Sequence, residues 1–339
     1  MIEQITSRNM RTQLRRLRMT AVVVALALLS MGCHGRPAEP LPKPVDAVSG
    51  IVSAFKSHPV VIVGEWHWIR QAGDFYIGLV RDPAFQDVAQ NIVVEFASRN
   101  NQELLDRYIA GEDVPISDVR RIWRDTTKVA SWESPIYAEW LAAIRDVNRT
   151  RPPGRRLRVL AGDTAIDWSH IHTHEQWATL GDNNVSFADV ISTEVLAKHQ
   201  HAFVVLGANH VGRSGDRKGD PNTTTRVEAH YPGATYVVIL DAGGWLTKST
   251  EELIEQAAQH PPELFNLTGT TLGQTADRNG VPLSKRADAL LYLCPPEDLK
   301  TAYPPPGSLD PQYLKEIDRR SMIEWGELRA RKFLGAAAR

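Results

Sequence analysis

The sequence predicts an α/β fold with a mostly parallel sheet of about six strands and flanking helices. Three observations predict it: short apolar runs recur, helical patterns separate them, and most runs end in a small or polar residue. The runs are nearly continuous in Val, Ile and Leu, which is typical of strands buried on both faces. They are PVVIVG (59–64), NIVVEF (91–96), RLRVLAG (156–162), AFVVLGA (202–208), TYVVILD (235–241) and ALLYLCP (289–295).

The segments between these runs carry apolar residues at helical spacing. Helices are expected over 71–90, 186–200 and 248–259, and a last helix over about 311–335. Strands that alternate with helices favour a layered architecture, with helices covering the faces of one sheet.

One connection is far longer than a crossover between strands requires. Residues 97–155 separate the second predicted strand from the third, and they contain helical patterns at 101–110 and 134–149. We predict a helical insertion that covers one end of the sheet. Two interpretations stay open: a lid that shapes a pocket, or a plain helical subdomain packed on its own aromatic residues.

The N-terminus has the pattern of an export signal. Five arginines precede the apolar stretch 19–31, which is short for a membrane span. The run LLSMGC resembles a bacterial lipobox, in which Cys33 would be lipidated; ordinary secretion and an uncleaved anchor are the alternatives. The expected organisation is a signal peptide (1–33), a proline-rich tether (34–45) and a single domain (46–339).

This organisation predicts a protein of the bacterial cell envelope. The lipid would anchor it to a membrane, with the domain facing the periplasm or the cell exterior. The net charge of −1 lacks the basic excess of nucleic-acid binders, so no nucleic-acid partner is expected.

Ionisable residues follow five of the six runs. The carboxyl ends of parallel strands meet at one edge of a sheet, where ligands bind in such folds, so these side chains are expected to lie together. The residues are Glu65, His67, Glu95, Asp163, His210 and Asp241. Acids also suit helix N-termini, so Asp163 and Asp241 in particular have helix capping as an alternative role.

The mixture of imidazoles and carboxylates suits acid–base chemistry on water. His67 and His210 could act as bases or metal ligands near neutral pH. Glu65 and Glu95 could orient an imidazole, carry a proton or bind a metal. A Ser or Cys nucleophile is not favoured, because the sequence has no G-x-S-x-G elbow. The candidate catalytic residues are Glu65, His67, Glu95, Asp163 and His210, and the candidate metal ligands are Glu65, His67 and His210.

Neighbouring side chains are candidates for substrate binding. Arg70 and Arg213 each lie three residues beyond one of the two histidines. Either could hold an anionic substrate or stabilise an oxyanion. Trp66 and Trp68 flank His67, and they are either pocket wall or packing under the inserted helices.

The motifs GEWH (64–67), VVEF (93–96) and GANH (207–210) carry a resemblance to a known superfamily. It unites erythromycin esterases, ChaN-type haem-binding lipoproteins and TraB/Tiki proteases, and the resemblance spans roughly residues 59–300. It implies an α/β core and a site formed by the two glutamates and two histidines of these motifs. Asp163 fits a less regular acidic position of the pattern.

The branches of this superfamily imply different functions. The esterases are similar as hydrolases that use His and Glu on water, and Tiki-type members are metal-dependent. The ChaN branch resembles this chain in its tight Glu-Trp-His spacing and in lipoprotein export. Its haem-ligating tyrosine has only Tyr76 and Tyr137 as candidates here. The resemblance implies a membrane-anchored hydrolase, with or without a divalent metal, acting on a small molecule; alternatively, it implies a lipoprotein that binds haem or another iron compound.

Overall fold

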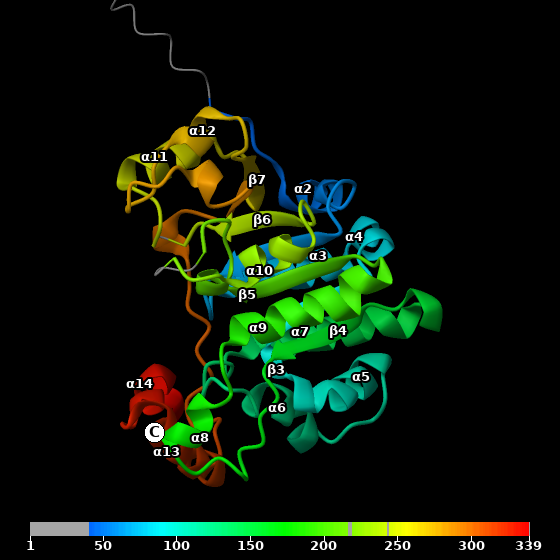
Figure 1. Cartoon of the computed structure of the whole chain (residues 1–339), viewed down its shortest axis with the longest axis vertical. Helices are drawn as coiled ribbons and strands as arrows, with labels where there is room; N and C mark the ends of the chain where they lie inside the picture. Colours follow the sequence, from blue (N-terminus) through cyan, green and yellow to red (C-terminus); the bar gives the residue numbers. More distant parts are fainter. Residues whose placement is uncertain (1–40, 216–218, 243, 339) are drawn as a thin grey trace, which may run out of the picture. The chain divides into compact units, whose positions relative to one another are not determined.

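Figure 1 shows a computed structural model of the chain, which describes residues 41–215, 219–242 and 244–338. The predicted signal peptide with Cys33, and most of the predicted tether, lie outside the described residues. Within those ranges, no helix combines the length and the apolar character that crossing a bilayer requires.

The described residues form one sheet of eight strands in the order β1-β7-β8-β6-β2-β5-β3-β4. Parallel pairing joins β2 to β5 on one side and to β6 on the other. This confirms the predicted mostly parallel α/β fold, and each of the six apolar runs contributes one strand. These are β2 (Val60–Glu65), β3 (Asn91–Ser98), β4 (Arg158–Asp163), β5 (Ala202–Gly207), β6 (Thr235–Leu240) and β8 (Ala289–Tyr292).

The sheet has eight strands rather than the expected number of about six, because two short strands are added at one edge. β7 (Glu263–Asn266) pairs antiparallel with β8, and β1 (Val45–Asp46) pairs antiparallel with β7. β1 has only two residues, and β7 (ELFN) has two apolar residues between polar ones, so neither forms an apolar run that can be recognised. Val45, which the sequence interpretation places at the end of the tether, is part of β1.

Helices cover both faces of the sheet, as Figure 1 shows. Val61 and Val63 of β2 belong to one hydrophobic core, whereas Val60 and Ile62 belong to the other. This burial on both faces explains the unbroken apolar runs. The first core includes α2 (Ala47–Ala54), α3 (Arg70–Arg81) and α4 (Pro83–Val88). The second includes α9 (Asn183–Val190), α10 (Thr223–His230), α11 (Lys248–Ala257) and α12 (Thr271–Gln274).

The long connection between β3 and β4 is helical. It contains α5 (Gln102–Ala110), α6 (Ile116–Arg124) and α7 (Pro135–Thr150), and α7 packs against α3. The residues between α6 and α7 form turns rather than a helix, and Thr127 among them contacts Asp163 at the end of β4. The insertion therefore reaches the edge of the sheet where the candidate residues lie.

Three of the predicted helices are interrupted. The 71–90 helix breaks before Pro83, because the residue that precedes a proline disfavours helical backbone. The last helix divides at Gly326 (φ 70°) into α13 (Pro311–Trp325) and α14 (Arg329–Leu334). The 186–200 helix continues beyond α9 as a π-helical turn at Ile191–Val195 and a 3-10 turn at Leu196–Lys198.

Candidate functional site

The carboxyl ends of three neighbouring strands, β2, β5 and β3, bring two glutamates and two histidines together. Glu65 is the last residue of β2, and Glu95 lies where the pairing of β3 becomes irregular beyond Val94. Irregular pairing of this kind redirects side chains near functional sites. We call Glu65, His67, Glu95 and His210 the strand-end cluster.

A buried carboxylate orients the imidazole of His67. The His67 Nδ1 atom lies 2.9 Å from Glu65 Oε1, which also accepts a hydrogen bond from the Tyr137 hydroxyl at 3.2 Å. The Glu65 side chain is 3% exposed and that of His67 is 37% exposed. An ionised carboxylate only accepts hydrogen bonds, so Nδ1 carries the hydrogen and Nε2 is the atom available for proton transfer.

Two glutamates favour the charged form of His67. Burial opposes the positive charge, but the hydrogen bond to Glu65 and the charges of Glu95 and Glu65 outweigh it. The pKa of His67 is therefore raised above its ordinary value of 6.5. The Trp132 ring packs against that of His67 in a T-shaped arrangement, with centroids 4.6 Å apart, and this contact restricts rotation of the imidazole.

Asn184 orients the second imidazole. Its Oδ1 atom lies 2.9 Å from His210 Nδ1 and accepts hydrogen bonds from the backbone N–H and the hydroxyl of Thr223. A backbone N–H can only donate, so the atom that meets it is the amide oxygen and His210 Nδ1 must carry the hydrogen. His210 Nε2 then faces Glu95 Oε1 at 3.4 Å. Sequence reasoning missed Asn184, because an asparagine in the first turn of a helix is usual in any fold.

Glu95 is a buried anion between the two imidazoles. Burial raises the pKa of this carboxyl, but the charge and hydrogen bond of His210, the charge of His67 and the Gly207 N–H lower it to about 2. The Gly207 N–H donates to Glu95 Oε2 at 2.5 Å. Glu95 is therefore ionised at neutral pH, and it stabilises positive charge on His67.

Gly207 has no side chain, and the cluster occupies the space that a Cβ atom at this position would need. A Cβ atom at this position would lie 2.9 Å from His67 Nε2 and 3.2 Å from Glu95 Oε2. The backbone φ of −54° suits any residue, so the requirement for glycine is one of space. His67 Nε2 and Glu95 Oε2 thus lie beside the same point of the backbone.

Replacing Gly207 with alanine is expected to displace the imidazole of His67, at a cost of about 1–3 kcal/mol in folding stability. Gly78→Ala is the matched control, because a Cβ atom there meets nothing within 4 Å. That control should raise stability by about 0.5–1 kcal/mol, since Gly78 lies inside α3. Denaturant unfolding measures both effects, and the NMR signals of His67 report the displacement. His67 signals that stay in place in Gly207→Ala would contradict this account.

Asp163 is bound by the insertion rather than by a residue of the strand-end cluster. Its oxygens accept hydrogen bonds from the backbone N–H (2.6 Å) and hydroxyl (2.7 Å) of Thr127, whose Oγ1 also accepts from Asn183 Nδ2 at 2.8 Å. Burial, helped by the charge of Glu95, raises the pKa of Asp163 to about 7, although the bonds from Thr127 and the charge of Lys128 oppose the shift. Its visible role is to hold the segment between α6 and α7.

The two predicted arginines do not lie with the cluster. Arg70 binds Asp74 (2.5 Å) and Glu139 (2.6 Å) on the surface of α3 and α7. Arg213 binds Asp288 and donates to Thr235 O at 2.8 Å, at the amino ends of β6 and β8. The spacing of the two arginines from the histidines could not reveal where their side chains point, because each arginine follows a turn.

The two tryptophans that flank His67 are packing residues in this structure. Trp68 is 8% exposed, and its Nε1 donates to the Ser131 carbonyl of the insertion at 2.6 Å. Trp66 is half-buried and lies over Gly244, where an added Cβ atom would come within 2.4 Å of its ring. Packing under the insertion, one of the two open interpretations, describes Trp68. Trp66 packs instead against the loop after β6, which neither interpretation included.

The arrangement does not fit a metal ion. Glu65 is engaged by His67 and Tyr137, and in the part of the chain that the structure describes no three His, Cys, Asp or Glu side chains could hold one. The candidate haem ligands Tyr76 and Tyr137 are each 2% exposed, so neither phenol is open to a haem iron. We therefore derive no chemical step through a metal.

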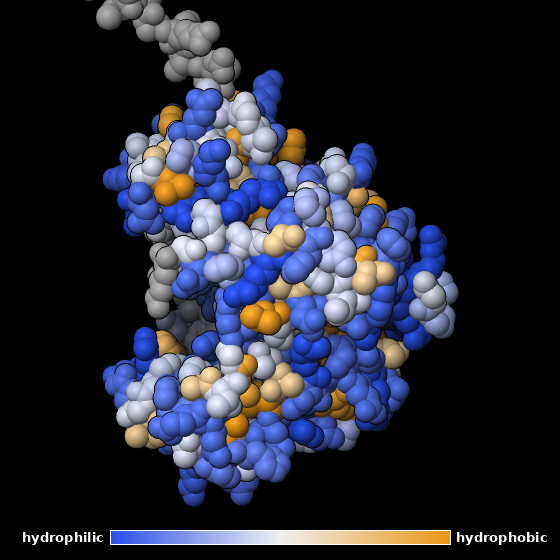
Figure 2. Space-filling view, viewed as in Figure 1, coloured by the Kyte–Doolittle hydropathy of each residue, from blue (hydrophilic) through white to orange (hydrophobic). Residues whose placement is uncertain are grey.

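A cavity of about 180 Å³ opens beside His210. Thr127 and Lys128 from the insertion form one wall, and Trp177 of α8 (His174–Ala178) and Asn183 of α9 form another. The insertion thus helps to shape a pocket. Figure 2 shows the surface hollowed between the part that carries α11 and α12 and the part that carries α8 and α13.

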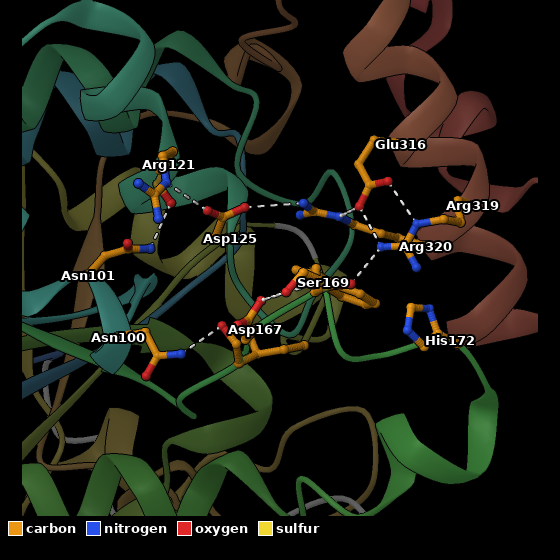
Figure 3. A pocket seen from close by; sticks show the side chains of 12 residues that line it. Asn100, Asn101, Arg121, Asp125, Asp167, Ser169, His172, Glu316, Arg319 and Arg320 are labelled. Atoms are coloured by element: carbon orange, nitrogen blue, oxygen red, sulfur yellow. Dashed lines mark hydrogen bonds and ion pairs between the residues drawn. The ribbon is translucent and has the colours of Figure 1, made fainter.

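A larger cavity of about 620 Å³ lies between α6, the loop after β4 and α13 (Figure 3). Its arginines are already bound, since Arg319 and Arg320 share Glu316 and Arg320 also contacts Asp125. The formal charges of its wall cancel: Arg121, Arg319 and Arg320 against Asp125, Asp167 and Glu316. No residue of the strand-end cluster is among those that line it, so the smaller cavity is the candidate site.

Comparison with known proteins identifies the fold alone. No family model and no curated protein matches the sequence. A solved succinoglycan biosynthesis protein is similar with a TM-score of 0.56 and 9% identity, over 75% of this chain and 94% of that one. A Bacillus cereus protein is similar with a TM-score of 0.51 and 11% identity, over the same shares, 75% and 94%. ChaN of Campylobacter jejuni, solved with cofacial haem, has a TM-score of 0.38 and 12% identity, over 59% of this chain and 88% of that one.

Proposed function

We propose that the protein is a hydrolase in which the strand-end cluster activates water. One observation carries the proposal: two imidazoles, each oriented through Nδ1, meet at the buried and ionised Glu95. A histidine held by a carboxylate through Nδ1 is the usual arrangement for transferring protons at Nε2.

His67 acts as the general base. Its Nε2 accepts a proton from water as the water oxygen bonds to the carbonyl carbon of the substrate. Glu65 and Glu95 stabilise the imidazolium that forms, in agreement with the raised pKa of His67. The proton that His67 Nε2 has taken from water passes to the leaving group when the bond to the carbonyl carbon breaks, which restores the neutral imidazole. His210 serves as the second acid–base group that relays this proton. Its place at the cavity supports this role.

We also propose that this activity belongs to the cell envelope. The support comes from the sequence: the basic N-terminus, the apolar stretch 19–31 and the lipobox-like Cys33. A lipid on Cys33 would hold the domain at a membrane surface through the proline-rich tether.

The test is a screen of protein that lacks the signal segment against ester, lactone and peptide substrates, with and without Mn²⁺, Co²⁺ or Zn²⁺. We expect hydrolysis of at least one class without added metal. His67→Ala should lower the rate by about 100-fold or more, the usual contribution of a positioned general base. His170→Ala is the matched control, because that side chain is 81% exposed and pairs with Asp167 outside the cluster. Full activity in a Glu65→Ala, His67→Ala double variant would reject the proposed roles.

Haem binding is the alternative that the sequence resemblance implies. With Tyr76 and Tyr137 buried, the accessible candidate ligand is the imidazole of His67. Titration of the same protein with micromolar haem, followed by absorbance, separates the two functions. A Soret shift that disappears in His67→Ala would replace the hydrolase proposal, and no shift would reject haem binding.

A further inference from the structure

We propose that Lys128 makes the cavity beside His210 a subsite for the carboxylate of a small anionic substrate. The inference rests on the proposed function for its chemistry, but it concerns binding. Three observations support it: Lys128 lies in the cavity wall, the backbone on both sides of Lys128 is held rigidly, and the Lys128 ammonium has spare hydrogen-bond donors.

A lysine and a candidate catalytic histidine line the same small cavity. Lys128 and His210 both line it, and its volume is about 180 Å³. Pockets for drug-sized ligands have about 300–1,000 Å³. A substrate with one acidic group and few other atoms suits this space.

The backbone on both sides of Lys128 is fixed by side chains from distant elements. Asp163 holds the N–H and hydroxyl of Thr127, and Trp177 Nε1 donates to the Thr127 carbonyl at 3.2 Å. On the other side, the Val129 N–H donates to Glu324 Oε2 at 3.1 Å. Ala130 follows with a φ of 57°, which is uncommon for a non-glycine residue. Strained and over-determined backbone of this kind is characteristic of functional sites.

The Lys128 ammonium has hydrogen-bond donors to spare. Its Nζ lies 3.4 Å from Glu324 Oε1, and the lysine side chain is 39% exposed whereas that of Glu324 is 2% exposed. An ammonium carries three N–H donors, so two remain for a ligand when Glu324 takes one. Trp177 lies beside it, with Nζ 5.4 Å from the ring centroid, and this contact limits the directions the lysine explores.

The other charges of the cavity favour a monoanion over a phosphate. Asp182 also lines it, and its carboxylate caps α9 through Asn184 and pairs with Arg226 at 3.3 Å. A phosphate dianion would meet the carboxylate of Asp182 in the wall, and its cation there would be Lys128, which Glu324 already pairs. A carboxylate carries half that charge, so Asp182 repels it less, and it can accept from the two Lys128 donors that Glu324 leaves.

The test uses the full-length protein in detergent micelles at constant ionic strength. Acetate and inorganic phosphate are titrated separately while the NMR signal of the His210 ring is followed. We expect acetate to shift this signal saturably and phosphate to bind more weakly. Lys128→Met keeps the length of the side chain and removes its charge, and it should weaken acetate binding by tenfold or more. Lys56→Met, at an exposed lysine, should leave it unchanged.

Acetate binding of equal strength in Lys128→Met would overturn the subsite, and tighter binding of phosphate would overturn the choice of a carboxylate. Lys128→Arg guards against misfolding, because it keeps the charge and should keep acetate binding. The outcome is separable from the proposed hydrolysis. Lysine-dependent acetate binding without any hydrolysis supports the subsite and rejects the enzyme, whereas hydrolysis with lysine-independent acetate binding does the reverse.

Discussion

Asp163→Asn is expected to stabilise the folded protein at and above pH 7 by on the order of 4 kcal/mol. In the folded state burial raises the pKa of Asp163 to about 7, from an ordinary value of 3.8. Asparagine resembles the neutral acid in size and charge. Its amide oxygen accepts from the Thr127 N–H, and its NH2 group donates to the Thr127 hydroxyl oxygen, so that hydroxyl no longer donates to residue 163. The substitution removes the cost of a buried negative charge and keeps the bond from the Thr127 N–H.

The sign follows from the direction of the shift. A folded-state pKa raised above the unfolded one stabilises the protein fully below pH 3.8, and this contribution is lost as the pH rises to about 7. Wild type and Asp163→Asn should therefore be equally stable near pH 3.5 and diverge between pH 4 and 7. Urea unfolding across this range measures the difference. Asp113→Asn, at an exposed loop aspartate, should show no such divergence, and a pH-independent difference for Asp163→Asn would contradict the raised pKa.

Glu95→Gln is expected to have the opposite effect on stability, with a loss of about 3 kcal/mol at neutral pH. The pKa of Glu95 is lowered to about 2 from 4.5, because the charges and hydrogen bonds of its neighbours outweigh burial. A lowered folded-state pKa contributes stability above pH 4.5, and this is lost as the pH falls toward 2. The difference between Glu95→Gln and wild type should therefore shrink over that interval.

The same substitution tests the electrostatics of the site. The charge of Glu95 helps to raise the pKa of His67, so the NMR titration midpoint of His67 should fall in Glu95→Gln. Hydrolysis, where it is observed, should fall with it, because the imidazolium loses a stabilising charge. Glu103→Gln, at an exposed glutamate of α5, is the matched control. A His67 titration midpoint that is the same in Glu95→Gln and wild type would show that the charge of Glu95 does not act on His67.

Apolar runs were sufficient to predict the parallel strands and the edge of the sheet where the site lies. Strands buried on both faces must be continuously apolar, and the carboxyl ends of parallel strands share one edge. The expectation that Glu65, His67, Glu95 and His210 meet follows from these two rules, and the structure brings the four together. β1 and β7 escaped prediction because β1 has two residues and β7 (ELFN) has only two apolar residues between polar ones.

Tertiary structure alone decided how each side chain is used. Arg70 and Arg213 turn toward acidic partners elsewhere, although their spacing from the histidines suggested otherwise. Asn184 reaches His210 from 26 residues away, and Thr127 reaches Asp163 from 36 residues away. Local periodicity encodes which residues are buried, because burial repeats with the geometry of a strand or helix. Hydrogen-bond partners and the direction of a side chain after a turn depend on how distant segments pack, and a single sequence carries no repeating signal for that packing.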